Sequence, residues 1–195
     1  MTLISDWRLL LTGSHSALRE AVAGVPSDAW DRVTPCEQWN ATQVLQHACG
    51  DQLGYASFIT GGPPPVENPF TPSGVLSAAP LQMVDDAVGA SAAAFATVAD
   101  DADEVPVPLP GGPLPAWLAA GACALDAAVH AWDIAVATGQ PSPLTPALAS
   151  DLFVVARRIT EPLRGFAYAP ALEGASGSEA QLLAYLGRRP DWSAG

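Results

Sequence analysis

Apolar residues recur along most of this chain with the three-to-four-residue spacing of a helix that buries one face. Clusters of glycine and proline interrupt the repeat and divide it into four long segments and two short ones. We expect helices at about residues 7–24, 41–60, 80–99, 115–138, 146–159 and 179–186. This order predicts an all-α protein, with a four-helix bundle over residues 1–140 and a short helical C-terminal extension over residues 141–195, packed on the bundle.

The expected helices begin at residues that favour helix termini. Asp6, Asn40, Thr145 and Ser178 each precede an apolar repeat, and their side chains can accept a hydrogen bond from a free backbone N–H. We therefore expect all four to be N-caps. The segment at 115–138 is apolar on nearly every face, which predicts that it is the most buried helix.

Two segments between the helices are rich in proline. Residues 61–74, GGPPPVENPFTPSG, predict a loop. Residues 105–110 alternate valine or leucine with proline, which excludes a helix. That pattern favours an extended segment or an edge-strand hairpin that turns at Gly111 and Gly112.

Ionisable side chains interrupt the apolar faces of two expected helices. The second helix carries His47 and Asp51 on its buried stripe. On the fourth helix Asp126 and His130 are four residues apart, so their side chains lie on one face and can converge with His47 on a single point. His15 lies off the apolar stripe of the first helix, and we expect it to be solvated.

Two imidazoles and one carboxylate form a recognised set of metal ligands. They leave a coordination position open, as in catalytic zinc sites, and they also match the ligands of non-haem Fe(II) enzymes. Asp51 and Asp133 are candidate hydrogen-bond partners for the outer imidazole nitrogens, and Trp39, Tyr55 and Trp132 are candidates to line a pocket. The alternative interpretation is that these side chains pack in a core, with the histidines hydrogen-bonded there.

The charge of the chain restricts its partners. Eight basic residues, all arginine, stand against 20 acidic ones, for a formal net charge of -12. The absence of lysine excludes Schiff-base chemistry and a P-loop lysine. So acidic a chain is a poor ligand for nucleic acid or an anionic membrane, and we expect a small-molecule substrate instead. Arg157, Arg158 and Arg164 could bind an anionic substrate, although a solvated surface is the favoured interpretation for them.

The cysteines and the N-terminal segment indicate a reduced, cytoplasmic protein. Cys36, Cys49 and Cys123 are an odd number without C-x-x-C spacing. Cys36 precedes a helix N-terminus, which would lower its pKa, although a packed cysteine is the commoner case. The opening MTLISDWRLLL has an acidic residue where a signal peptide is basic, so we expect no signal peptide, and no apolar run reaches membrane-spanning length.

Three segments together resemble one family. TPCEQWNATQVLQHACGDQL (residues 34–53) resembles its TPC-x-x-W…H signature, LDAAVHAWDIAVATG (125–139) its H-x-W-D-(L/I)-A segment, and LLAYLGRRPDW (182–192) its LL-x-x-LGR-x-P ending. The three occur in the family's order and span nearly the whole chain. The sequence is therefore similar to the DinB-like metal-binding proteins, in the actinobacterial branch that includes mycothiol-dependent maleylpyruvate isomerase.

The resemblance implies a DinB-like four-helix bundle that binds a divalent metal between its second and fourth helices. Zinc is the first choice, with nickel or iron as alternatives. The ligands would be His47, Asp126 and His130. Relatives have glutamate or histidine at the position of Asp126. Because aspartate is one methylene shorter, the helix must approach the metal more closely, or a water must bridge.

The resemblance also implies a function. It suggests a metal-dependent thiol transferase or isomerase in which the metal activates the thiolate of a low-molecular-weight thiol such as mycothiol. Three alternatives stay open: a metal-free small-molecule-binding or biosynthetic protein, a metal-assisted hydrolase, and an Fe(II) enzyme with the same ligands. The sequence leaves the substrate and the oligomeric state open, with a homodimer as one possibility.

Overall fold

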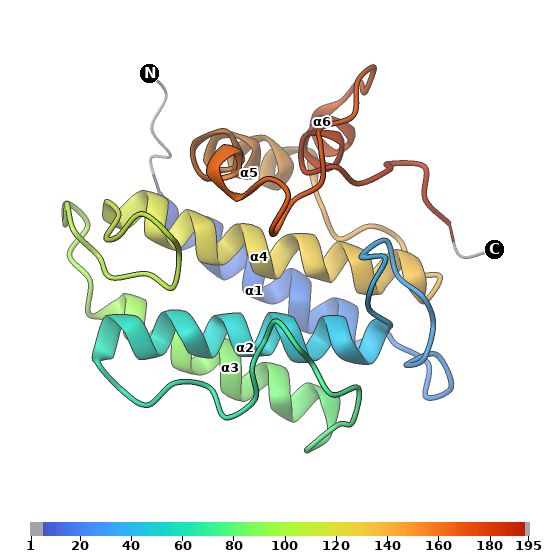
Figure 1. Ribbon diagram of the computed structural model, residues 1–195, viewed down its shortest axis with the longest axis horizontal. Helices are drawn as coiled ribbons and strands as arrows, with labels where there is room; N and C mark the ends of the chain where they lie inside the picture. Colours follow the sequence, from blue (N-terminus) through green and yellow to red (C-terminus); the bar gives the residue numbers. More distant parts are fainter. Residues whose placement is uncertain (1–5, 194–195) are drawn as a thin grey trace.

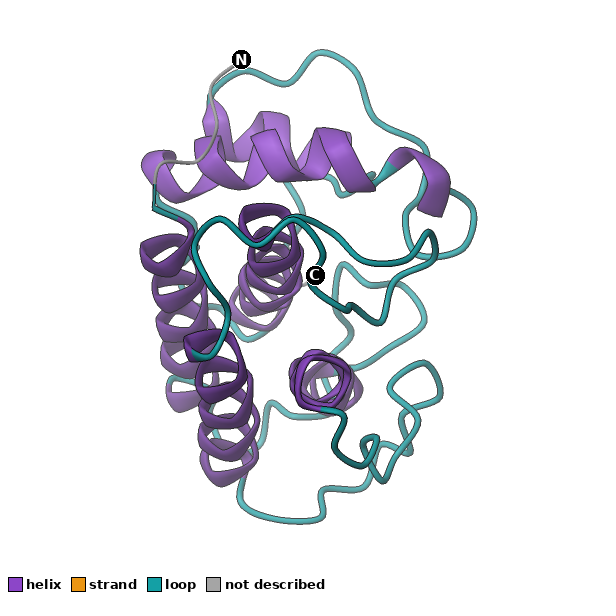
Figure 2. Cartoon of the chain, turned by 90° about the vertical axis from the view of Figure 1, so that its left-hand side faces the viewer, coloured by secondary structure: helices purple, strands orange, loops and turns teal. Residues whose placement is uncertain are grey.

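The structure is a computed structural model that describes residues 6–193. Within this range the chain forms six α-helices, one 3₁₀-helix and no β-strand (Figure 2). The helices are α1 (Trp7–Ala23), α2 (Ala41–Thr60), α3 (Pro80–Ala96), α4 (Ala116–Ala137), α5 (Pro146–Ile159), η1 (Glu161–Leu163) and α6 (Ser178–Tyr185). Residues 1–5, part of the segment in which we expected no signal peptide, lie outside the described range.

Helices α1 to α4 form the bundle. α1 packs against α4 and α3, and α2 packs against α3 and α4. Helix α5 packs on α4 and α6 packs on α5, so that the extension lies on the opposite side of α4 from α2 (Figure 1). This confirms the predicted all-α bundle with a helical extension, while the division of the chain at residue 140 stays a prediction.

Local hydrogen bonds begin three of the helices where the sequence predicts. The Asp6, Asn40 and Thr145 side chains each accept from a backbone N–H three residues on. The prediction for Ser178 is wrong: it is the first residue of α6, and Gly177 occupies the cap position. The Ser178 hydroxyl is instead hydrogen-bonded to that of Ser150 on α5, 2.9 Å away.

Helix α4 is the core helix, as its composition predicts. Nearly all of its side chains are buried, and its many alanines let neighbouring helices approach closely. At Gly121 a Cβ atom would lie 2.6 Å from Cγ2 of Val155, so α5 packs there against bare backbone. Helix α4 is long and apolar enough to cross a membrane by length and composition alone, but 89% of its apolar window is buried inside this fold.

The expectation that His15 is solvated is wrong. Its side chain is buried, and Nε2 lies 2.8 Å from Oε1 of Gln52 on α2. The Ser91 hydroxyl on α3 and the Cys123 thiol on α4 also donate to that Gln52 oxygen. Because α1 packs against α3, α4 and α5, more than its apolar stripe is covered, and one buried polar cluster connects the four bundle helices.

The segment between α3 and α4 turns without forming strands. Val105 and Leu114 make a single antiparallel bridge, and the chain turns through Gly111 and Gly112, whose φ angles of 107° and 91° favour glycine. Helix α3 ends at Ala96, earlier than the predicted end near residue 99, and the backbone N–H and the hydroxyl of the C-cap residue Thr97 both donate to the carbonyl of Ala94.

Candidate metal centre

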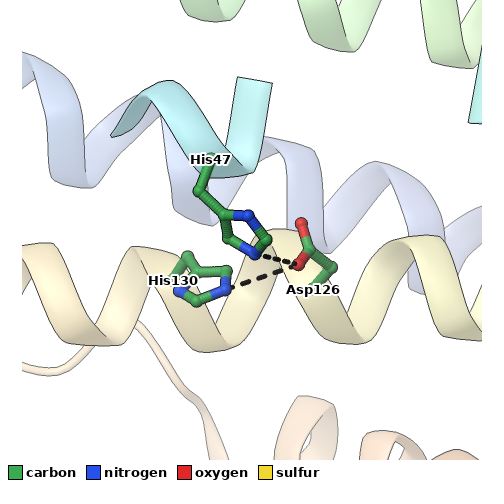
Figure 3. Close-up of side chains that lie close together, drawn as sticks. All are labelled: His47, Asp126 and His130. Atoms are coloured by element: carbon green, nitrogen blue, oxygen red, sulfur yellow. Dashed lines mark ion pairs between the residues drawn. The ribbon is translucent and has the colours of Figure 1, made fainter. Parts of the chain in front are cut away.

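Three predicted ligands converge between α2 and α4. Asp126 Oδ1 lies 3.6 Å from Nε2 of His47 and 3.4 Å from Nε2 of His130 (Figure 3). One ligand atom from each residue lies within 4.8 Å of the others. Ligands about 2.1 Å from a tetrahedral zinc ion are separated by roughly 3.4 Å, so these side chains fit a three-ligand metal site with an open position. The shorter aspartate reaches both imidazoles.

The surroundings of Asp126 leave a negative charge poorly compensated. Its Oδ2 atom is buried and has no hydrogen-bond partner. Burial and the neighbouring Asp51 carboxylate raise the pKa of Asp126 well above its ordinary value. Burial also raises the pKa of Asp51, although His47 opposes this. Two crowded carboxyl groups beside two imidazole nitrogens are an environment that a divalent cation would stabilise.

A buried acid orients His130. The Nδ1–H of His130 donates to Oδ2 of Asp133 at 2.9 Å, which leaves the lone pair of Nε2 directed at Asp126. Burial lowers the pKa of His130 to about 4 despite the opposing hydrogen bond to Asp133, so the ring is neutral near pH 7. A neutral imidazole is the form that binds metal.

An arginine of the C-terminal extension holds Asp133 in place. Arg188 donates from Nε and Nη2 to the two carboxylate oxygens, at 2.9 and 2.7 Å. Burial would raise the pKa of Asp133, but the charge and hydrogen bonds of Arg188 lower it to about 2. Asp133 therefore stays ionised, and Arg188 helps through it to orient the candidate ligand His130 on α4.

His47 is oriented by backbone instead of by an acid. Its Nδ1–H donates to the carbonyl of Pro69 at 2.9 Å, so its Nε2 lone pair faces the other ligands. The outer nitrogen of His47 is thus bonded to the carbonyl of Pro69, and not to Asp51 as the sequence suggested. The Asp51 carboxylate lies 3.8 Å from Nε2, on the same side as Asp126.

A cavity of about 600 Å³ opens beside these ligands. Its walls include Trp39 and Tyr55, two of the predicted pocket residues, whereas Trp132 is buried in the core and does not line it. Sequence reasoning missed further lining residues, which come from segments outside α2 and α4: Pro69, Phe70, Phe166, Tyr168 and Arg188. Arg188 could have been identified from the sequence, because it lies within the family-like LGRRP segment.

The structure also bears on the expectations for the arginines and for Cys36. The arginine that lines the cavity is Arg188, and Arg157, Arg158 and Arg164 are not among the lining residues. Burial and the charge of Asp133 raise the pKa of Cys36 to about 11, so the expected lowering is wrong. A thiol of that pKa is a packed wall residue and not a nucleophile.

Comparisons with known proteins agree with this fold. Residues 11–135 match the family described as the mycothiol maleylpyruvate isomerase N-terminal domain. Two uncharacterized proteins of Mycobacterium tuberculosis, from strains CDC 1551 / Oshkosh and H37Rv, are each 29% identical over 154 residues, which is 76% of this chain and of each relative.

A solved structure shares the fold. The crystal structure of a histidine-to-alanine mutant of the mycothiol-dependent maleylpyruvate isomerase superposes with a TM-score of 0.60 and 16% identity, over 82% of this chain and 70% of that one. The family match covers more than half of the chain and spans α2 and α4. This chain therefore belongs to the mycothiol maleylpyruvate isomerase N-terminal domain family.

Proposed function

We propose that this protein is a metal-dependent enzyme that uses a low-molecular-weight thiol of the mycothiol type, as an isomerase or S-transferase. The observation that carries the proposal is the convergence of His47, Asp126 and His130 beside a cavity large enough for ligands. The family to which the chain belongs supports the choice of thiol. Zinc is the proposed metal, with nickel or iron as alternatives.

The residues of the site have separate roles in this proposal. His47 and His130 each offer Nε2 to the metal, and each ring is fixed by a hydrogen bond at its outer nitrogen. Asp126 supplies the charged ligand. A divalent metal held there would lower the pKa of an incoming thiol and hold the thiolate. The cavity walls position the second substrate and exclude water, which would compete as a nucleophile.

Metal analysis tests the site. Protein purified without chelator or nickel affinity resin is expected to carry near-stoichiometric metal, and His130→Ala and His47→Ala are expected to lose it. Leu9→Ala, at an exposed position on α1, is the matched control and should keep the metal. A wild-type protein without metal that is fully active would contradict the proposal and favour a metal-free binding or biosynthetic role.

Turnover with and without thiol tests the chemistry. The metal-loaded protein is incubated with an electrophile, with and without mycothiol, and the product is identified by mass spectrometry. We expect turnover, seen as an isomerised product or an S-conjugate, only when the thiol is present. Turnover that ignores the thiol would overturn the proposal and indicate a metal-assisted hydrolase. The cytoplasmic location and a homodimeric state stay predictions.

A further inference from the structure

The cavity beside the metal centre collects the exposed phenylalanines of the chain. Three of its five phenylalanines are more than half exposed: Phe58 at 52%, Phe70 at 51% and Phe166 at 73%. All three line this cavity, whereas Phe95 and Phe153 pack against the core. Exposed rings gathered around one cavity indicate a binding surface, because scattered surface phenylalanines would show no such preference.

Aromatic rings lie in contact one after another, from the candidate ligand His47 outwards to Phe166. The ring centroids of Trp39 and His47 are 4.6 Å apart, those of His47 and Phe70 5.8 Å, and those of Phe70 and Phe166 5.8 Å. Phe70 belongs to the loop between α2 and α3, and Phe166 follows η1. Two distant segments therefore meet around the cavity through aromatic contacts, and the exposed faces of Phe70 and Phe166 stay available for a further planar ring to stack on.

The described residues that line the cavity offer no free cationic side chain to an anionic ligand. Arg188 is the one arginine among them, and its Nε and Nη2 atoms already donate to both carboxylate oxygens of Asp133. The carboxylate of a substrate would therefore lose its water in this cavity without gaining a cationic partner among these side chains.

From these contacts, and from the lack of a free cationic side chain in the cavity, we propose that the second substrate of this site is an uncharged aromatic small molecule, held by stacking on the exposed rings of the cavity. The inference rests on the proposed function, which makes this molecule the second substrate beside a thiol. It separates this chain from an enzyme whose substrate is a dicarboxylate, since nothing among the lining residues supplies the paired cationic groups that bind two carboxylates.

Competitive binding tests the proposal without requiring turnover. The neutral fluorescent dye N-phenyl-1-naphthylamine is bound to the metal-loaded protein and displaced with 2-naphthalenemethanol or 2-naphthoate, which share a ring system and differ in charge. We expect the alcohol to bind at least about tenfold more tightly than the carboxylate. Equal or tighter binding of 2-naphthoate would overturn the proposal.

Variants at exposed positions locate the binding. Phe166→Ala is expected to raise the Kd for 2-naphthalenemethanol by about three- to tenfold, because one stacking surface is lost. Leu9→Ala removes an exposed apolar side chain on α1 and should leave the Kd unchanged. Thermal unfolding checks that both variants are folded. An unchanged Kd in Phe166→Ala would contradict the assignment.

The binding and turnover experiments can fail separately. If the protein shows no thiol-dependent turnover but binds 2-naphthalenemethanol more tightly than 2-naphthoate, the proposed function is overturned and the uncharged aromatic ligand is supported. If it shows thiol-dependent turnover but binds 2-naphthoate more tightly, the proposed function is supported and the uncharged ligand is overturned.

Discussion

Asp126 is the proposed carboxylate ligand of the site, and its side chain is largely buried. Its Oδ1 atom lies within 3.6 Å of both imidazole nitrogens, while Oδ2 has no hydrogen-bond partner. The length of an aspartate side chain is therefore matched to the spacing of α2 and α4 at this position. A longer side chain would have to fold back within a buried site, where rotamer changes are costly.

Substituting Asp126 by asparagine tests the charge of the carboxylate separately from the length of the side chain. Asp126→Asn keeps the shape but removes the charge, and we expect it to lose near-stoichiometric metal, because only two neutral nitrogens and a weakly coordinating amide remain. Metal content after dialysis, measured by elemental analysis, checks this expectation. Asp28→Asn, at an exposed position outside the site, is the matched control. Full metal content in Asp126→Asn would show that the carboxylate is not a ligand.

The chemistry of single residues predicts three helix caps correctly but not the burial of His15. Asp6, Asn40 and Thr145 cap helices through bonds to residues three positions on, so nothing outside the segment decides them. The prediction for His15 fails because its burial depends on neighbouring helices that cover a second face of α1. The spacing of Asp126 and His130 is visible in the sequence because a single helix sets it.

At the scale of the helices, the contact between α4 and α5 depends on a missing side chain. A Cβ atom on Gly121 would lie 2.6 Å from a methyl group of Val155, closer than packed atoms approach. The β-branched valine cannot easily move its methyl away, since its χ1 is restricted in a helix. The separation of these two helices is thus set by glycine on one side and valine on the other.

Gly121→Ala is expected to destabilise the protein by about 1–2 kcal/mol through overpacking, despite the better helix propensity of alanine. Urea unfolding measures this change. In the Val155→Ala background the same substitution should be stabilising, because the clash is gone. Gly89→Ala on α3 is the control: a Cβ atom there would have nothing within 4 Å, so it should gain roughly 0.5–1 kcal/mol. Equal effects of Gly121→Ala in both backgrounds would rule out the clash.

Helical periodicity predicts the elements of this fold, but not how loops complete the site. The apolar repeat marks α1 to α6 because each buries a face. Pro69 and Phe70 lie in a loop without periodicity, and they reach His47 only through the folded path of that loop. No pattern within the loop sequence itself predicts these contacts with His47.

At the scale of the whole molecule, the extension and the bundle share one ion pair. Arg188 follows α6, Asp133 lies on α4, and both side chains are nearly inaccessible to solvent. Because Asp133 also accepts from His130, the extension contributes through Asp133 to the orientation of a candidate metal ligand. The pairing spans 55 residues of sequence, so the family-like LGRRP segment marks Arg188 but does not reveal its partner Asp133.

Arg188→Gln is expected to lower the free energy of unfolding by about 3–5 kcal/mol, since it leaves the buried Asp133 without its counter-charge. Metal affinity should fall by about 10–100-fold, as is typical when the support of a ligand is lost. Chemical denaturation and competition with a chelator measure the two effects. In Asp133→Asn the same arginine substitution should cost less, and equal costs in both backgrounds would contradict the coupling.

The ion pair between Arg188 and Asp133 also affects when the proposed site can form during synthesis of the chain. The ribosome releases α4 well before residue 188, so the emerging bundle carries Asp133 for dozens of residues without this partner. Until Arg188 emerges, His130 has no firmly held acceptor for its outer nitrogen. The proposed site therefore reaches its full geometry only after residue 188 has been synthesised, and capture of an ion by a shorter nascent chain is disfavoured.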